Sequence, residues 1–127
     1  MLFRSLAIDD IATMVQESIA HGVDAISLFG EVSPFHTGAE LNYLALKNFG
    51  SATNPKANVD VFIRDVAAPL LGGEELARDF LKYATLTHEP KRIAEVMPAI
   101  RKQCALLPAE QARRWIWLGN FLASYAY

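Results

Sequence analysis

The sequence predicts a mainly helical protein with a minimal α/β element, built from five or six helices and one short strand. Over most of the chain, apolar residues recur every three or four positions, which is the spacing of a buried helical stripe. Glycines and prolines divide these stripes into segments of ordinary helix length. Residues 23–29 (VDAISLF) differ, because they form a short apolar run rich in strand-forming residues.

The first 50 residues predict a helix, a strand and a second helix. Ile8, Ile11, Val15 and their neighbours form a stripe over 8–21, and Gly22 supplies a helix end. The buried strand follows over 23–29. A second helix begins near position 37, where the TGAE sequence fits a capping box between Thr37 and Glu40, and it ends at Gly50. This order of elements is typical of a parallel α/β protein.

The second part of the chain predicts helices only. Residues 51–58 are polar and rich in turn formers, so we expect a surface loop there. A third helix begins after Asn58, is interrupted near Pro69 and ends at Gly72 and Gly73. The remaining helices are expected over about 74–86, from Pro90 with a kink or break at Pro98, and from Pro108 to the C-terminal region. In the third helix, Phe62 belongs to the apolar stripe and is predicted to lie in the core.

Length and composition favour one folded unit over residues 1–127. Within it, residues 1–50 form the αβα element and residues 51–127 a helical extension. The apolar content of 52% with 20% charged residues is ample for a packed core and excludes a disordered chain.

Charge and segment patterns exclude several kinds of partner. The net charge of −2 argues against nucleic acid. No apolar run is long enough to span a membrane, and Arg4, Asp9 and Asp10 interrupt the apolar run that a secretory signal would need, so we expect a soluble, cytoplasmic protein. The lone Cys104 cannot form an internal disulfide, and its helical neighbours favour a place in the core.

Two stretches of sequence carry a family resemblance. DAISLFGEVSPFHTGAELNYLALKNFG and VFIRDVAAPLLGGEELARDFL resemble the last strand, last helix and helical extension of glycoside-hydrolase-like (β/α)8 barrels, a TIM-type fold. The resemblance implies that residues 23–29 are the eighth strand and that Glu31 lies at the mouth of the barrel. A complete barrel needs about 250 residues, so the first six or seven units are missing. The paired carboxyl groups of such enzymes usually lie on those earlier strands.

Glu31 and His36 are the candidate substrate-binding residues. Glu31 follows the predicted strand directly, where α/β folds place functional groups, and it could bind sugar hydroxyls or act as an acid or base. The structural alternative is that Glu31 holds a neighbouring loop, that His36 is an exposed loop residue and that Glu40 only caps a helix. The three histidines, His21, His36 and His88, share no metal-binding spacing, so we predict neither a metal nor another cofactor.

Aromatic residues near the C-terminus are the second candidate site. Trp115, Trp117, Phe121, Tyr125 and Tyr127 could stack on sugars or contact a partner protein, and Trp115, Trp117 and Tyr125 are the predicted interface residues. The alternative is core packing with a helix–helix contact. The adjacent pair Arg113 and Arg114 is expected on a solvated face.

Two functions remain open from the sequence. The first is a glycoside-hydrolase-like C-terminal segment that contributes at most a carbohydrate-binding rim and is not catalytic alone. Its partners would be a saccharide and the missing barrel portion, and any enzymatic activity would be glycoside hydrolysis. The alternative is a small helical protein-interaction or oligomerisation module without enzymatic activity. A homodimer would also satisfy the unpaired edges of a single strand.

Overall fold

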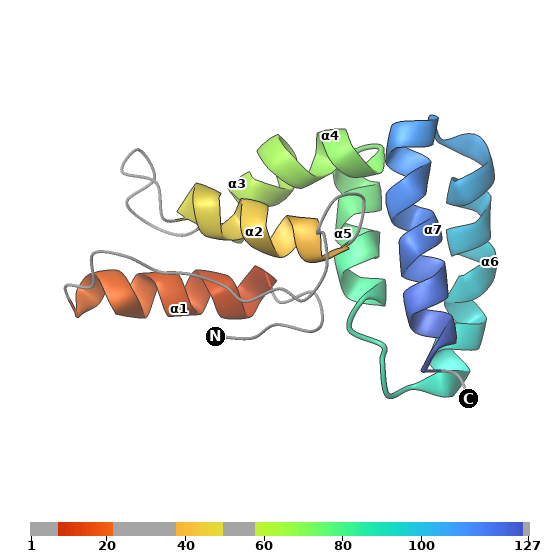
Figure 1. The fold of residues 1–127 in the computed structure, drawn as a ribbon, viewed down its shortest axis with the longest axis horizontal. Helices are drawn as coiled ribbons and strands as arrows, with labels where there is room; N and C mark the ends of the chain where they lie inside the picture. The colour runs from red at the N-terminus through yellow and green to blue at the C-terminus, as the bar shows by residue number, and fades with distance from the viewer. Residues whose placement is uncertain (1–7, 22–37, 50–57, 126–127) are drawn as a thin grey trace.

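The described part of the chain is built entirely from helices. The computed structural model describes residues 8–21, 38–49 and 58–125. The elements in chain order are α1 (Ile8–Ala20), α2 (Gly38–Phe49), α3 (Val59–Phe62), the π-helical turn η1 (Ile63–Ala67), α4 (Ala68–Leu71), α5 (Glu74–Tyr83), α6 (Pro90–Leu106) and α7 (Ala109–Ala123). In Figure 1, α1 and α2 lie side by side in the left half, and α6 and α7 lie side by side at the right. Helices α4 and α5 lie between these two pairs, and α3 is above α2 in this view.

The predicted fold class is wrong for these residues. No strand occurs among residues 8–21, 38–49 and 58–125, so a mainly α fold with an α/β element resembling the end of a TIM-type barrel is not what forms. The physical reason is that each apolar stripe in these segments buries itself against another helix, which gives a helix-on-helix core. The strand predicted over 23–29 lies outside the described residues.

The first two predicted helices, on either side of residues 22–37, are confirmed. In α1, Ile11 and Val15 are fully buried, and in α2, Leu41, Ala45 and Phe49 are fully buried. The two stripes face each other, because α1 and α2 pack together. Both helices belong to the same hydrophobic core as the rest of the described chain.

The segment from Val59 to Leu71 is one continuous helical stretch with a wider turn in its middle. Asn58 caps it, because its side-chain oxygen accepts a hydrogen bond from the Val61 N–H at 3.1 Å. In the π turn, the Ala68 N–H donates to the carbonyl of Ile63, five residues back. The wide turn lies directly before Pro69, which has no N–H to continue the α-helical ladder. The interruption predicted near Pro69 therefore takes the form of a π turn rather than a break.

The turn between α4 and α5 depends on glycine. Gly72 has a φ of 107°, in the left-handed region, and a Cβ at this position would meet Leu107 Cδ2 at 2.7 Å. The two glycines therefore end α4 as the sequence predicts.

Helix α6 departs from its prediction. It runs from Pro90 to Leu106 as a single helix and includes Pro98. Pro98 is exposed, so its ring lies on the solvent side of the helix. Of the described helices, α7 is the one against which α6 mainly packs.

Phe62 is fully buried, as predicted, and its ring lies 5.5 Å from that of Phe49 on α2. We expect Phe62→Ala to lower the free energy of unfolding by about 3–5 kcal/mol, because the truncated side chain leaves a cavity between α2 and α3. Denaturant unfolding measures this change. Leu106→Ala is the control, because Leu106 is strongly exposed and its loss should change the free energy by less than about 0.5 kcal/mol. An unchanged midpoint for Phe62→Ala would contradict this packing.

No helix in the described residues has both the length and the apolar character needed to cross a bilayer.

Candidate interaction surface

The inner face of α7 closes the C-terminal end of α4. Three α7 side chains donate hydrogen bonds to the last three carbonyl groups of α4: Gln111 Nε2 to Pro69 at 3.0 Å, Arg114 Nη1 to Leu70 at 3.4 Å and Trp115 Nε1 to Leu71 at 2.9 Å. The remaining carbonyl, that of Ala68, accepts from the N–H groups of Gly72 and Gly73. Since the last four carbonyls of a helix have no partner within it, this arrangement satisfies all four. It also fixes the rotation of α7 about its own axis.

A buried ion pair connects α7 with α2. Arg114 Nε lies 3.2 Å from Glu40 Oε2, and Arg114 Nη2 lies 3.1 Å from Glu40 Oε1. The two side chains are 7% and 17% exposed. Arg114 Nη1 also donates to the carbonyl of Glu110 at 2.8 Å. The pair is therefore bidentate and shielded from water, which makes it stronger than a surface ion pair.

This ion pair corrects one sequence-based expectation. Arg114 was expected on a solvated face, and that prediction is wrong, whereas Arg113 is exposed and pairs with Glu110 at 3.5 Å. The capping partner predicted for Glu40, Thr37, lies outside the described residues. Glu40 binds the guanidinium group of Arg114, which lies 74 positions further along the chain.

A flank of α7 next to its core-facing side carries a row of aromatic side chains, of which Trp117 and Phe121 pack partly against the hydrophobic core. Trp117, Phe121 and Tyr125, which we call the aromatic row, follow one another at four-residue spacing, so they lie on one flank of the helix. The rings of Trp117 and Phe121 stack at 4.8 Å with an interplanar angle of 13°. Phe121 and Tyr125 meet edge to face at 5.2 Å. None of the three side chains is fully buried, and Tyr125 is 37% exposed.

Both ends of the aromatic row contact other parts of the chain. Trp117 stacks on Phe80 of α5, with centroids 6.4 Å apart, and Tyr125 meets the ring of His88 edge to face at 6.0 Å. These contacts hold the rings in defined orientations. The row is therefore a preformed surface feature, which lowers the entropic cost of binding a partner.

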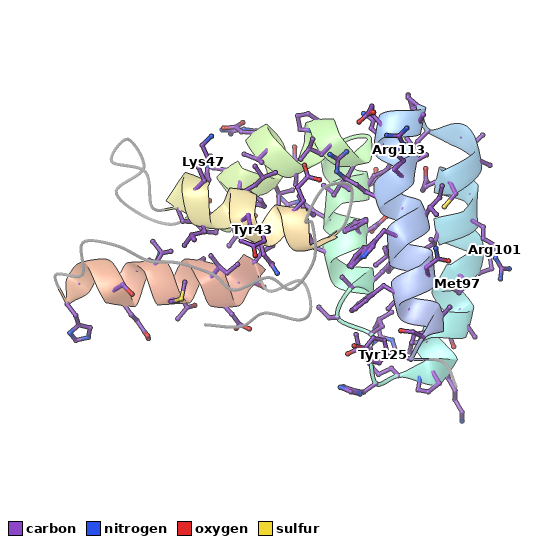
Figure 2. All side chains as sticks on the ribbon, in the orientation of Figure 1. Tyr43, Lys47, Met97, Arg101, Arg113 and Tyr125 are labelled. Atoms are coloured by element: carbon purple, nitrogen blue, oxygen red, sulfur yellow. The ribbon has the colours of Figure 1, made fainter. Side chains whose placement is uncertain are left out.

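A second row of exposed residues runs beside the aromatic row. Ile116, Asn120 and Ser124 each precede one of its members, and all three are exposed. Ile116 is 48% exposed, which is unusual for a large aliphatic side chain. Together the two rows form the outer face of α7. Figure 2 places Tyr125 near the C-terminal end of this helix and Arg113 near its beginning.

The structure separates the predicted site residues into three groups. Glu31, His36 and Tyr127 lie outside the described residues, and the substrate-binding role of Glu31 and His36 stays a prediction. Trp115 lies in the core, where it is 1% exposed and packs edge to face against Phe80 at 5.2 Å. That position leaves Trp117 and Tyr125 as the predicted interface residues that reach the surface.

Burial changes the acidity of two groups near the core. Burial raises the pKa of the Tyr83 hydroxyl, and the negative charge of Asp79 raises it further. Burial also raises the pKa of the Cys104 thiol. The folded state binds the proton of the Cys104 thiol more tightly than the unfolded state does. This difference stabilises the fold at a pH below the ordinary thiol pKa. The stabilisation is lost as the pH rises through the folded value. No cluster of metal-ligating side chains occurs in the described residues.

We expect Cys104 to react with iodoacetamide more slowly in the folded chain than in denaturant, because a raised pKa and partial burial reduce the reactive thiolate. The rate is measured at about pH 8, near the ordinary thiol pKa. Cys104→Ala carrying Ala99→Cys, an exposed position on α6, is the control and should react at similar rates in both states. Equal rates for Cys104 folded and unfolded would contradict the burial of its thiol.

No protein-family model matches the chain, and no curated protein or solved structure was found to match it. The resemblance to the C-terminal portion of glycoside-hydrolase-like (β/α)8 barrels is therefore corrected. No matching structure supports it, and the described residues form helices without a strand. What the structure defines is a helical core with an aromatic outer face on its last helix.

Proposed function

We propose that the chain is a helical oligomerisation module in which two copies pair through the outer face of α7. The observation that carries this proposal is the aromatic row, whose three rings are ordered along one helix and remain partly accessible. Aromatic side chains contribute most strongly at the centres of protein interfaces, because they bury a large area at a small entropic cost. Ile116, on the neighbouring row, adds exposed aliphatic surface that pairing would bury.

The spacing of the row is compatible with a contact between two identical copies. Phe121 is its central member, with one aromatic residue four positions before it and one four positions after it. A two-fold axis near Phe121 would align two α7 helices antiparallel, with Trp117 of each copy facing Tyr125 of the other. Such an isologous contact uses the same surface twice and closes at two copies. The full row spans about 12 Å at 1.5 Å per residue, which is short enough to remain in register.

The size of the outer face is consistent with a small interface. Trp117 and Phe121 are only partly exposed and Tyr125 is 37% exposed, so pairing would bury a fraction of the roughly 150–250 Å² of each aromatic side chain, whereas a standard interface buries about 800 Å² per partner. The aromatic row would therefore form the apolar centre, and Ile116, Asn120 and Ser124 would form much of the rim. A flat platform for a sugar ring is less well matched, because the rings of Phe121 and Tyr125 are inclined at 68°.

Light scattering in about 0.5 M salt tests the proposal, because charged surface contacts are screened there. We expect the wild-type chain to approach twice its mass of 14.1 kDa as concentration rises. Tyr125→Glu should return it to 14.1 kDa, because the substitution introduces a charge into the apolar contact. Ala99→Glu, at an exposed position on α6, is the matched control and should leave the dimer intact.

Circular dichroism of each variant separates loss of pairing from loss of fold. Tyr125 is already partly exposed, so Tyr125→Glu should keep the helical signal and the cooperative melt of the wild type. A wild-type chain that stays at 14.1 kDa over the whole concentration range would contradict the proposal. A folded Tyr125→Glu variant that still dimerises would contradict the role of the aromatic row.

A further inference from the structure

Charge is unevenly distributed between the two ends of the described chain. Helices α1 to α5, with η1, carry nine carboxylates against four basic side chains, whereas α6 and α7 carry two carboxylates against six basic side chains. The net charge of −2 for the whole chain conceals this separation. When one molecule carries a negative and a positive surface, the negative surface of one copy can face the positive surface of another.

The negative end is the exposed side of α1. Asp9, Asp10 and Glu17 are exposed, and α1 contains no basic residue. Asp10 and Glu17 are seven residues apart, so they lie on the same side of the helix, two turns apart. None of these three carboxylates forms an ion pair within the described part of the chain. We call these three residues the acidic face.

The positive end is the exposed side of α6. Lys91, Arg101 and Lys102 are exposed, and we call them the basic face. Lys91 and Lys102, eleven residues apart, lie on one side of the helix, three turns apart, and the exposed Glu95 on that side leaves the face with a net positive charge. Figure 2 shows Arg101 extending from the outer edge of α6, away from the other helices.

The cations of the basic face have no carboxylate partner within the described residues. Among the described arginines, Arg101 alone has no carboxylate partner. The others each pair with a carboxylate: Arg64, Arg78, Arg92, Arg113 and Arg114. Lys91 and Lys102 likewise have no ion pair within the described residues. The fold thus neutralises its other guanidinium groups and leaves this helix edge positively charged.

We propose that the acidic face of α1 in one copy docks against the basic face of α6 in a second copy. Figure 1 places α1 in the left half of the molecule and α6 at the right-hand edge, so one copy cannot make this contact with itself. Each copy offers one acidic face and accepts one at its basic face. Such a head-to-tail contact is heterologous and joins copies into rings or open chains. It uses a surface different from the outer face of α7 and does not depend on that pairing.

Salt dependence distinguishes the two contacts. Attraction between exposed charges is strong at about 20 mM salt and largely screened at about 0.5 M. We therefore expect the mass of the wild-type chain to rise above that of a dimer at low salt, in a concentration-dependent way. At high salt the mass should fall to that of the dimer that pairs through the outer face of α7. Loss of the α7 contact would instead show as a 14.1 kDa species at high salt, with association at low salt retained.

Charge reversal on either face provides the decisive experiment. One variant carries Lys91→Glu, Arg101→Glu and Lys102→Glu, and the other carries Asp9→Lys, Asp10→Lys and Glu17→Lys. Each variant alone has two faces of the same sign, so each should lose the salt-dependent association. Mixing the two restores opposite charges and should restore masses above the dimer. Because acidic residues stabilise the first turn of α1, Glu17→Lys alone is measured as well and should weaken association with the fold intact.

The control reverses two exposed cations elsewhere, Lys47 on α2 and Lys82 on α5, through Lys47→Glu and Lys82→Glu. This variant should associate like the wild type, which shows that position matters and net charge alone does not. A wild-type mass that is the same at low and high salt would overturn the proposal. A mixture of the two reversed variants that does not associate would overturn it too.

Discussion

Replacing Arg114 with alanine is expected to lower the free energy of unfolding by about 3–5 kcal/mol, because it leaves the partly buried Glu40 carboxylate without its cation. It also removes the donors to the carbonyls of Leu70 and Glu110. Denaturant unfolding followed by circular dichroism measures the change. Arg113→Ala is the matched control: its ion pair with Glu110 is exposed and should contribute less than about 1 kcal/mol.

A double-mutant cycle shows whether the two charges act together. Glu40→Ala should be destabilising by itself, because it strands the buried guanidinium. The double variant Glu40→Leu and Arg114→Leu should cost less than the sum of the single alanine losses, since it leaves no unpaired charge. If Arg114→Ala and Arg113→Ala had equal effects on the free energy of unfolding, the ion pair would not connect α2 to α7 in the way described.

Trp115→Ala is expected to have an effect of similar size, about 3–5 kcal/mol, because it empties the space between α7 and Phe80. Trp115→Phe separates the contribution of the indole hydrogen bond to stability from that of the side-chain volume. It retains much of the ring but leaves the buried Leu71 carbonyl without its donor, which should cost about 1–3 kcal/mol.

Trp117→Phe is the control for Trp115→Phe, since Trp117 is only partly buried and its indole N–H donates no hydrogen bond within the described residues. It should shift the unfolding midpoint less than Trp115→Phe does. Equal shifts would mean that the hydrogen bond to Leu71 adds nothing measurable to stability.

The helical elements could be predicted from sequence where an apolar stripe was bounded by a cap or a glycine. Asn58, Gly72 and Gly73 marked the ends of the helical stretch between them correctly, and the stripe through Phe62 is buried as expected. At Pro98 the prediction of a kink or split was too strong. A proline that faces solvent on an exposed helix edge can be accommodated without ending the helix.

The candidate site was only partly predictable. Four-residue spacing identified the aromatic residues of α7, but it could not tell which of the two tryptophans faces the core. That distinction depends on Phe80 and on the carbonyl of Leu71, which come from other helices. The pairing of Glu40 with Arg114 has no local signature, because the two residues are 74 positions apart in the chain. The family resemblance led to a fold class that the helices of the described residues contradict.

We propose that two copies pair through the outer face of α7, and cysteine cross-linking tests this pairing most directly. Asn120 is exposed and adjoins Phe121, so a two-fold axis near Phe121 would bring the two copies of Asn120 close together. In a chain carrying Cys104→Ala, Asn120→Cys should form an intermolecular disulfide under mild oxidation in about 0.5 M salt. Ala99→Cys in the same background should remain uncross-linked. Cross-linking of Asn120→Cys no faster than that of Ala99→Cys would contradict the pairing of copies through α7.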